Sequence, residues 1–502
     1  MNTRIAIAAD DNTGATDAAG MLTSFGAKAL LILDPSLLEE LQCENKRPVE
    51  KESPVEYDVV VLSTRIRSIP PDEAYDLTYR VLKALGDWGF DILQLKYCST
   101  FDSTPEGNIG KSLDAAQDLL GFSSTIVCPA LPVNGRTTYM GYHFVHGLLL
   151  SESPLSRHPL NPMTDSNLLR WLGYQTRRGI GLIRLDTIRS GAEAISKTRR
   201  KLEDEGAAYH VCDAIEQKDI DLTVEAYSDK TLPDGGPTFL SGGSGVSLSL
   251  GNLYYSDLPS LDYTRELQKL SPVLAVISGS ESPTAQSQRA YAKAHGFIEI
   301  TVNPLDILAE YARTTQETQG KSAALGKKEK GWEDSEMIVH TTERIASACK
   351  EGKSVVTALE RKNGGSVEEV NEEARRKGLG PVETGELIAT FLGKIAARLV
   401  HNNFIERLLV AGGETSGAVC RECGFKALEV GLPIDPGVPY CFPVDFSSLR
   451  QETPRNSETP ASSSHRRTPL VILKSGNFGE EDLYPRAARL GSKTVKEDNS
   501  KG

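Results

Sequence analysis

The stretch Leu408–Gly417, which reads Leu-Leu-Val-Ala-Gly-Gly-Glu-Thr-Ser-Gly, decides how the chain is interpreted. Its apolar run ends at two glycines, followed by Glu414, two hydroxyl residues and a segment compatible with a helix. This order predicts a strand, a tight turn and a helix N-terminus. Glycine lets the backbone approach a ligand, and the free amides of a first helical turn attract an anion. The stretch therefore indicates a phosphate site, with an ordinary strand-to-helix turn as the alternative.

Length and composition restrict the class of protein. A chain of 502 residues is too long to fold around a single hydrophobic core, so two or more domains are expected. The net charge of −12 gives no basic footprint for nucleic acid or for an anionic membrane. We expect no membrane span and no signal peptide, because no apolar run is long enough and Arg4–Ala9 already reads as a core strand.

The eight cysteines are scattered, as in a reduced protein of the cytoplasm. Cys420 and Cys423 are spaced like half of a zinc site, but no second cysteine pair or histidine pair lies near them. We therefore assign no metal ligands from the sequence.

Short β-type runs alternate with amphipathic helical patterns in both halves of the chain, which predicts an α/β fold. We expect two three-layer α/β/α domains with mostly parallel sheets and an active-site cleft between the domains. The expected boundaries are an N-terminal domain over 1–250, a linker over 251–270, a second domain over 271–490 and a disordered tail over 491–502. Three polar stretches without apolar periodicity are expected to be surface insertions, namely 43–56, 314–334 and 450–467.

Polar side chains follow the predicted strands of the first half. Parallel sheets bind ligands beyond the C-terminal ends of their strands, so these side chains are candidates for a common site. They are Asp10, Asp11, Arg65, Asp102, Ser103, Thr104, Asn108 and Arg136. Arginine would clamp a carboxylate and aspartate would accept from hydroxyls, which suits a small polyhydroxy acid. The alternatives are that an aspartate caps the next helix and that the arginines lie on the surface.

Three turns rich in glycine and hydroxyl residues follow strands of the second half: Ser278–Pro283, Gly412–Gly417 and Lys474–Gly479. Meeting at one sheet edge, they would form a cradle of backbone amides for nucleotide phosphates, to which Lys474 could add a positive charge. The sequence has neither a P-loop nor a GxGxxG with its downstream acidic residue, so a P-loop and a dinucleotide fold are disfavoured.

These motifs resemble the four-carbon acid sugar kinases, on the branch that acts on 3-oxo-tetronate. The similarity runs in order along nearly the whole chain. It is carried by Ala9–Ala15, Cys98–Gly110, Cys128–Arg136, His158–Asn167, Val410–Gly417, Ile434–Pro439 and Leu473–Gly479. Asn12 departs from the leucine or phenylalanine usual there, and the three insertions depart from the compact bacterial pattern.

The resemblance implies ATP-dependent phosphorylation of the C4 hydroxyl of 3-oxo-tetronate, with ATP and Mg²⁺ as cofactors. Asp11, Arg65 and the segment around Asp102, Ser103 and Thr104, which extends to Asn108, would contact the acid, with Arg136 as a second anchor. Asp10 or Asp11 would orient or deprotonate the attacking hydroxyl, and the choice between them stays open. The nucleotide would be contacted by Ser278, Gly385, Gly412, Gly413, Glu414, Thr415 and Gly476.

Three alternatives stay open. The first is a threonate or erythronate kinase, the second a non-catalytic sensor of sugar acids, and the third a dehydrogenase acting on the same acid. The expected partners are the acid and ATP, with a homodimer allowed, and the expected location is cytoplasmic.

Overall fold

The structure is a computed structural model that describes residues 3–37, 57–157, 161–228, 236–321, 335–360, 367–445 and 469–492. By its internal contacts the chain divides into two compact units. Within the described residues, unit 1 holds the chain up to Leu261 with Ala427–Gly437 and Asp445, and unit 2 holds Asp262–Lys426, Val438–Val444 and 469–492. The insertions expected at 43–56 and 450–467, and residues 493–502, lie outside the described residues.

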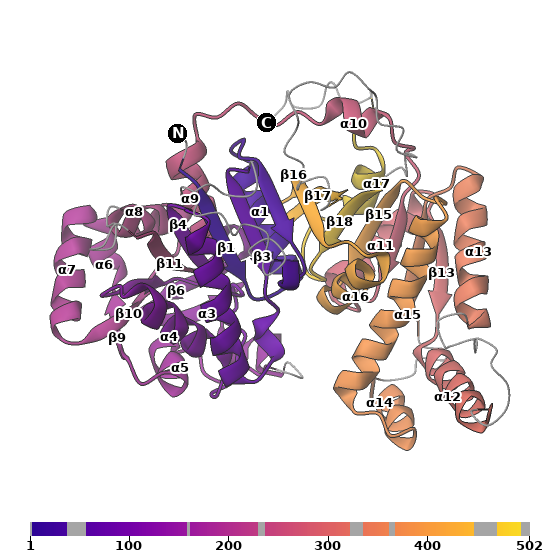
Figure 1. Ribbon diagram of the computed structural model, residues 1–502, viewed down its shortest axis with the longest axis horizontal. Coiled ribbons are helices and arrows are strands. Elements are labelled where there is room, and N and C mark those ends of the chain that lie inside the picture. The colour runs from indigo at the N-terminus through magenta and orange to yellow at the C-terminus, as the bar shows by residue number, and fades with distance from the viewer. Residues whose placement is uncertain are drawn as a thin grey trace. The chain divides into compact units, whose positions relative to one another are not determined.

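The main sheet of unit 1 has the strand order β11-β4-β1-β3-β2-β16 (Figure 1). Its strands are β1 Ile5–Ala9, β2 Ala29–Ile32, β3 Val59–Ser63, β4 Ile92–Lys96, β11 Thr238–Gly242 and β16 Ala427–Asp435. The first five are parallel, and β16 pairs antiparallel with β2. Every residue of those five parallel strands is buried. Burial on both faces explains why these strands read as apolar runs without alternation.

Helices cover both faces of this sheet. The chain crosses from β1 to β2 in one direction and from β3 to β4 in the other. Because such crossovers are right-handed, α1 (Asn12–Thr23) and α3 (Pro71–Asp87) lie on opposite faces. α9 (Ser244–Tyr255) packs on α1, and α4 (Asn108–Leu120) packs on α3. The expected three-layer arrangement is therefore confirmed for unit 1, and its change of direction opens a crevice at the C-terminal end of β1.

Unit 1 also contains a small parallel sheet, built from runs that read as β-type in the sequence, and a β-meander, which the sequence interpretation did not include. The small sheet is β5 Thr125–Val127, β10 Ala207–Cys212 and β9 Gly179–Ile183, and the meander is β6 Arg136–Tyr139, β7 Tyr142–Val145 and β8 Leu148–Leu149. The remaining helices are α5 Leu168–Gln175, α6 Leu185–Arg189, α7 Ala192–Asp204 and α8 Gln217–Ser228. Both meander turns, at Met140-Gly141 and His146-Gly147, have positive φ at both residues. That geometry matches the twist of the strands it joins.

Two buried histidines make unit 1 sensitive to acid. His143 in β7 contacts Thr138 Oγ1 at 2.9 Å and Ser99 O at 2.8 Å, and His210 contacts the Tyr227 hydroxyl at 2.5 Å. Burial lowers the pKa of each to about 4. The unfolded chain protonates near 6.5, so the stability present above pH 6.5 is lost as the pH falls from 6.5 through 4.

We therefore expect His143→Gln to lose less stability than the wild type between pH 7 and pH 5, by about 2 kcal/mol. Urea unfolding at the two pH values measures the difference. His340→Gln, which changes an exposed histidine, is the control and should follow the wild type. Equal pH dependence in all three proteins would contradict the prediction.

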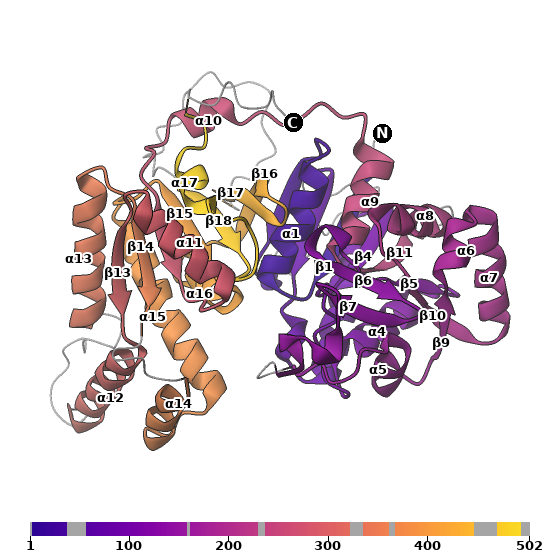
Figure 2. The same ribbon diagram turned by 180° about the vertical axis from the view of Figure 1, so that it is seen from behind.

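Unit 2 repeats the α/β plan with the strand order β17-β18-β15-β12-β14-β13, in which only β17 is antiparallel among the described strands. Its strands are β12 Ala275–Ser278, β13 Ile298–Val302, β14 Val355–Leu359, β15 Arg407–Ala411, β17 Val438–Val444 and β18 Leu470–Lys474. Its helices are α10 Thr264–Gln268, α11 Pro283–Ala294, α12 Pro304–Lys321, α13 Glu336–Lys350, α14 Val367–Arg376, α15 Pro381–His401, α16 Gly413–Cys423 and α17 Leu483–Ala488 (Figure 2). None of the helices in the described ranges combines the length and apolar character of a membrane span.

Three local predictions need correction. The region expected as a linker is partly helical, because α9 continues to Tyr255 and α10 lies within it. The buried Arg407 of β15 holds the end of this region in place, because it donates to Leu267 O at 3.0 Å and to Ser271 O at 2.7 Å. The insertion expected from residue 314 begins inside α12, which continues to Lys321. Residues 427–437, expected in the second domain, group with unit 1, where Thr23 Oγ1 donates to Gly431 O at 2.8 Å.

Candidate active site

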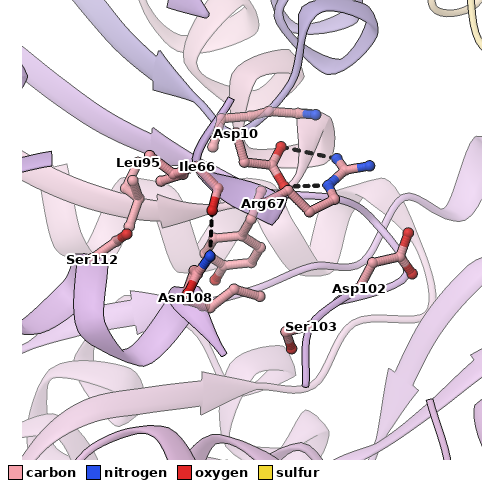
Figure 3. A pocket seen from close by; sticks show the side chains of 11 residues that line it. Asp10, Ile66, Arg67, Leu95, Asp102, Ser103, Asn108 and Ser112 are labelled. Carbon is pink, nitrogen blue, oxygen red and sulfur yellow. Dashed lines mark hydrogen bonds and ion pairs between the residues drawn. The ribbon is translucent and has the colours of Figure 1, made fainter. Parts of the chain in front are cut away.

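A pocket lies at the C-terminal ends of β1, β3 and β4 in unit 1 (Figure 3). We call it the acid pocket, and it is lined by Asp10, Ile66, Arg67, Leu95, Lys96, Tyr97, Asp102, Ser103, Asn108, Ile109 and Ser112. Its cavity volume is ≈ 10 Å³, which is about the space that one water needs. The cavity is therefore too small for a four-carbon acid as it stands, and residues that line it must move to admit one.

An arginine–carboxylate clasp dominates the acid pocket. Arg67 Nε donates to Asp10 Oδ2 at 2.8 Å and Arg67 Nη2 to Asp10 Oδ1 at 3.0 Å, while Nη1 lies 3.0 Å from Asp11 Oδ2. Burial opposes the charge of Arg67, but both aspartates outweigh it and raise the pKa of Arg67. Arg67 thus holds a fixed positive charge at the C-terminal end of β1, and its guanidinium has the bidentate geometry that binds a carboxylate.

Asp11 does two jobs in the structure. Its Oδ1 accepts from the Gly14 amide at 2.6 Å and so caps α1, while its Oδ2 faces Arg67. Burial would raise the pKa of Asp11, but Arg67, Lys96 and the Gly14 amide together hold it below the usual value. The carboxylate is therefore ionised and partly exposed, whereas Asp10 is only 4% exposed and engaged on both oxygens.

Lys96 and Asp17 add charge behind the clasp. Lys96 ends β4 and is 3% exposed, and its Nζ occupies the space that a Cβ on Gly14 would fill, at 2.0 Å. Asp17, one turn into α1, accepts from Ser244 Oγ on Oδ2, while its Oδ1 is buried without a hydrogen-bond partner in the described structure. Burial raises the pKa of Asp17, with Lys96 opposing. Asp17 Oδ1 is thus a buried acceptor near the site that the described structure leaves without a hydrogen bond.

Some residues of the segment after β4 line the acid pocket, and others hold the segment in place. Asp102 lines the pocket and accepts from Thr100 at 2.7 Å, and the Asn108 amide ties down the chain by donating to Ile69 O at 2.8 Å. Ser103 Oγ accepts from Trp171 at 3.0 Å and Gln175 at 2.9 Å, and so anchors the loop. Thr104 lies outside the pocket lining. Phe101, which precedes Asp102 in this segment, has a φ of 55°. This is a strained conformation of the kind found at functional sites.

Neither predicted arginine lines the acid pocket. Arg65 has a φ of 57° and directs Nη2 to Leu33 O at 3.4 Å, which leaves the pocket to Arg67. Arg136 begins β6, where its Nη1 donates to Asn134 O and its Nε is buried without a hydrogen-bond partner among the described residues. Of the residues predicted for the acid end of the site, the pocket brings together the catalytic candidate Asp10 and the binding candidates Asp102, Ser103 and Asn108, with Asp11 ion-paired to Arg67.

The three predicted turns of unit 2 meet at one sheet edge. The Gly279 and Ser280 amides both donate to Ala411 O, at 3.1 and 3.2 Å, and the Gly412 amide donates to Lys474 O at 2.9 Å. Ser282 Oγ donates to Gly476 O at 2.7 Å. We call these turns, at 278–282, 412–416 and 474–479, the glycine cradle. Ser278, Gly412, Gly413, Thr415 and Gly476 all belong to it.

Close packing explains the glycines of the cradle. A Cβ on Gly279 would lie 2.0 Å from Thr415 Oγ1, and one on Gly476 would lie 2.2 Å from Ser280 Oγ. Gly412 has a φ of 117°, which L side chains rarely adopt. Gly385, in α15, packs beside the cradle, because its Cβ would lie 3.2 Å from Glu414 Oε2. Glycine at these positions thus lets the three turns pack closely, which brings the first amides of α16 to the same sheet edge as the other two turns.

No group of three or more metal-ligating side chains occurs among the described residues. The described cysteines are all free, and Cys420 and Cys423 are buried within α16. Mg²⁺ in nucleotide sites needs only one or two carboxylates beside the phosphates. Glu414, exposed in the first turn of α16, is a carboxylate at the cradle that fits this need.

Three site residues escaped the sequence interpretation: Arg67, Lys96 and Asp17. Arg67 stands two residues beyond Arg65, and nothing local tells which of the two turns inward, since that depends on the left-handed backbone at Arg65. Lys96 carried a usable signal, because it follows an apolar strand directly and a charged residue at a strand end faces the ligand edge. Asp17 lies on a helix where it reads as an ordinary polar position.

Family models and relatives agree over nearly the whole chain. A sugar-binding N-terminal domain matches residues 5–250 and a nucleotide-binding C-terminal domain matches residues 275–484. Proteins called 3-oxo-tetronate kinase are 33% identical in Pseudomonas savastanoi pv. phaseolicola (96% of each chain covered) and 32% identical in Salmonella typhimurium (97% of this chain and 99% of the relative).

Solved structures agree as well. A Salmonella typhimurium LT2 protein solved as a proposed tRNA synthase has a TM-score of 0.70 at 30% identity, over 97% of this chain and 99% of that one. A Haemophilus influenzae protein has a TM-score of 0.62 at 27% identity, over 96% and 98%. With both domains matched and relatives similar over their full length, the chain belongs to the four-carbon acid sugar kinase family.

Proposed function

We propose that the protein is an ATP-dependent kinase that phosphorylates the C4 hydroxyl of 3-oxo-tetronate. The carrying observation is that the chain pairs a bidentate arginine clasp at a strand edge of unit 1 with a glycine cradle at a strand edge of unit 2. The first suits a small carboxylic acid and the second a polyphosphate. The relatives called 3-oxo-tetronate kinase support the same reaction.

At the acid end, Arg67 would exchange one of its aspartate partners for the substrate carboxylate. Asp11, ionised and partly exposed, would then accept the proton of the C4 hydroxyl or orient it. In the transfer, the hydroxyl oxygen forms a bond to the γ-phosphorus while the bond from that phosphorus to the bridging oxygen of ADP breaks. Phosphoryl transfer depends mainly on such positioning and on neutralising charge.

At the nucleotide end, the amides of residues 413–415, in the first turn of α16, and the hydroxyls of the 278–282 turn would hold the phosphates. Mg²⁺, when bound, neutralises charge on the phosphate oxygens, with Glu414 as its protein ligand in this proposal. The glycines keep the backbone within hydrogen-bonding reach of the phosphate oxygens.

A coupled assay of ADP release tests the proposal across 3-oxo-tetronate, threonate and erythronate in both D and L forms. We expect the highest kcat/KM with a 3-oxo-tetronate. A clear preference for threonate or erythronate would replace the substrate and keep the kinase. No ATP turnover with any of these acids, despite tight acid binding, would overturn the kinase in favour of a sensor.

Asp11→Asn is expected to lower kcat by about 10²–10⁴ with a smaller effect on KM for the acid. The variant keeps the shape of the cap on α1 but loses the charge that accepts the proton. Steady-state kinetics at saturating ATP measure the split, and Asp72→Asn, at a 96% exposed position, is the control. Wild-type kcat in Asp11→Asn would remove this residue from the reaction.

Location and assembly belong to the same proposal. The free cysteines of the described chain suit a reducing compartment, so we place the reaction in the cytoplasm. A homodimer is tested by light scattering coupled to size-exclusion chromatography.

A further inference from the structure

A lysine without a counter-charge is buried in the glycine cradle. Lys474 ends β18 and has 0% relative exposure. Its Nζ donates to Gly476 O at 3.2 Å, and no carboxylate of the described residues lies within 4 Å of it. A buried ammonium without an anion is unfavourable, so such a group either loses its proton or awaits a negative ligand.

The surroundings of Lys474 supply no hidden partner. The titratable groups on the elements packed against β18 are Arg407 on β15, Tyr440 and Cys441 on β17, and Glu414, Cys420, Arg421, Glu422 and Cys423 on α16. None of them contributes to its titration: burial alone lowers the pKa of Lys474, to about 7. Free protein at neutral pH therefore holds a mixture of charged and neutral Lys474.

The position of Lys474 points to phosphate. Its Nζ shares the Gly476 carbonyl with Ser282 Oγ, so it lies against the 278–282 turn. Its own carbonyl accepts from the Gly412 amide, which joins it to the turn before α16. A second buried group of the cradle, Ser416 Oγ, also has no hydrogen-bond partner in the described structure. The cradle thus holds a buried amine that lacks a counter-charge and a buried hydroxyl that lacks a hydrogen-bond partner in the described structure.

We propose that Lys474 is a direct ligand of the nucleotide phosphates and takes up a proton when the nucleotide binds. The inference rests on the proposed nucleotide-binding role of unit 2. An anion brought to Nζ supplies the missing counter-charge and so stabilises the ammonium. Because binding and protonation are linked, nucleotide affinity must fall as the pH rises above the pKa of free Lys474.

Calorimetric titration of the full chain with Mg-ATP, in buffers of different ionisation enthalpy, measures the proton uptake. At pH 8.0 the phosphates are already ionised. The wild type should then take up about 0.9 proton per nucleotide, and its affinity should fall roughly tenfold from pH 8 to pH 9. Lys474→Met should take up none and bind ATP about a hundredfold more weakly at pH 7. Lys353→Met, at an exposed position, is the matched control and should behave as the wild type.

A melting curve separates ligand loss from misfolding. Without ATP, Lys474→Met should unfold at a temperature no lower than the wild type, because it removes a buried amine and keeps the apolar stem. ATP binding by the wild type without proton uptake, or with equal affinity in Lys474→Met, would overturn the inference while leaving the kinase intact. No ATP binding by the wild type would instead overturn the proposed function.

Discussion

Arg67→Met is expected to lower kcat/KM for the acid about a thousandfold, with KM for ATP nearly unchanged. Arg67 contacts both aspartates at the end of β1, and in the proposed reaction its guanidinium receives the substrate carboxylate. Methionine keeps the length and the apolar contacts of the stem but offers no donor. Steady-state kinetics with each substrate varied in turn separate the two KM values.

The same substitution should cost about 3–5 kcal/mol of stability, because Asp10, 4% exposed, would be left without its partner. The double variant Asp10→Asn/Arg67→Met removes both charges. It should recover most of that stability and none of the activity, which distinguishes a functional role from a structural one. Arg67→Lys should fall between, since an ammonium keeps the charge but not the fork.

Arg65→Met decides between the two arginines. The family resemblance favours Arg65 as the carboxylate anchor, whereas in the structure Arg67 lines the pocket. A large rise of KM for the acid in Arg65→Met, with Arg67→Met close to wild type, would show that the resemblance located the anchor correctly. Arg170→Met removes an exposed ion pair and is expected to leave the kinetics unchanged.

The sequence predicted well those helices and strands that depend on the local pattern of residues. β1 lies within the run Arg4–Ala9 that reads as a core strand, and β15 and α16 follow the predicted order of strand, tight turn and helix, because apolar runs in doubly covered strands and glycine turns are visible in neighbouring residues. β16 was missed because its partner, β2, lies about 400 residues away: Leu428 pairs with Leu31. Nothing in the segment itself indicates which strand it will join.

The site divides in the same way. The glycine cradle could be predicted, because each of its turns has glycine and hydroxyl residues directly after a strand, and this pattern is visible in the sequence. The acid pocket could be predicted only as a set of strand ends. Which side chain turns inward depends on the backbone conformation at Arg65 and Phe101, both of positive φ. Lys96 and Asp17 belong to the site because packing buries them beside the acid pocket. Such features depend on packing between elements and leave no local signature.

Gly412→Ala is expected to raise KM for ATP at least about tenfold, since forcing an L-residue into this region of φ costs on the order of 1–3 kcal/mol. The φ of Gly412 is 117°, and its amide donates to Lys474 O at 2.9 Å. The turn can relieve the strain only by rotating, which would turn the amides of the cradle away from the phosphates. KM for the acid should change little, because the acid pocket belongs to unit 1.

Gly424→Ala is the matched control for that variant. Gly424 ends the same helix, α16, with a φ of 72° and open space around its Cβ position. Alanine there adopts the left-handed helical region, at a cost of about 1–2 kcal/mol, at the opposite end of the helix from the cradle. If Gly424→Ala raised KM for ATP as much as Gly412→Ala, general destabilisation of α16 would explain both, and the cradle geometry would not be the cause. Gly279→Ala, whose Cβ would meet Thr415 Oγ1 at 2.0 Å, should reproduce the loss through a clash instead of strain, so agreement between the two would locate the effect in the cradle.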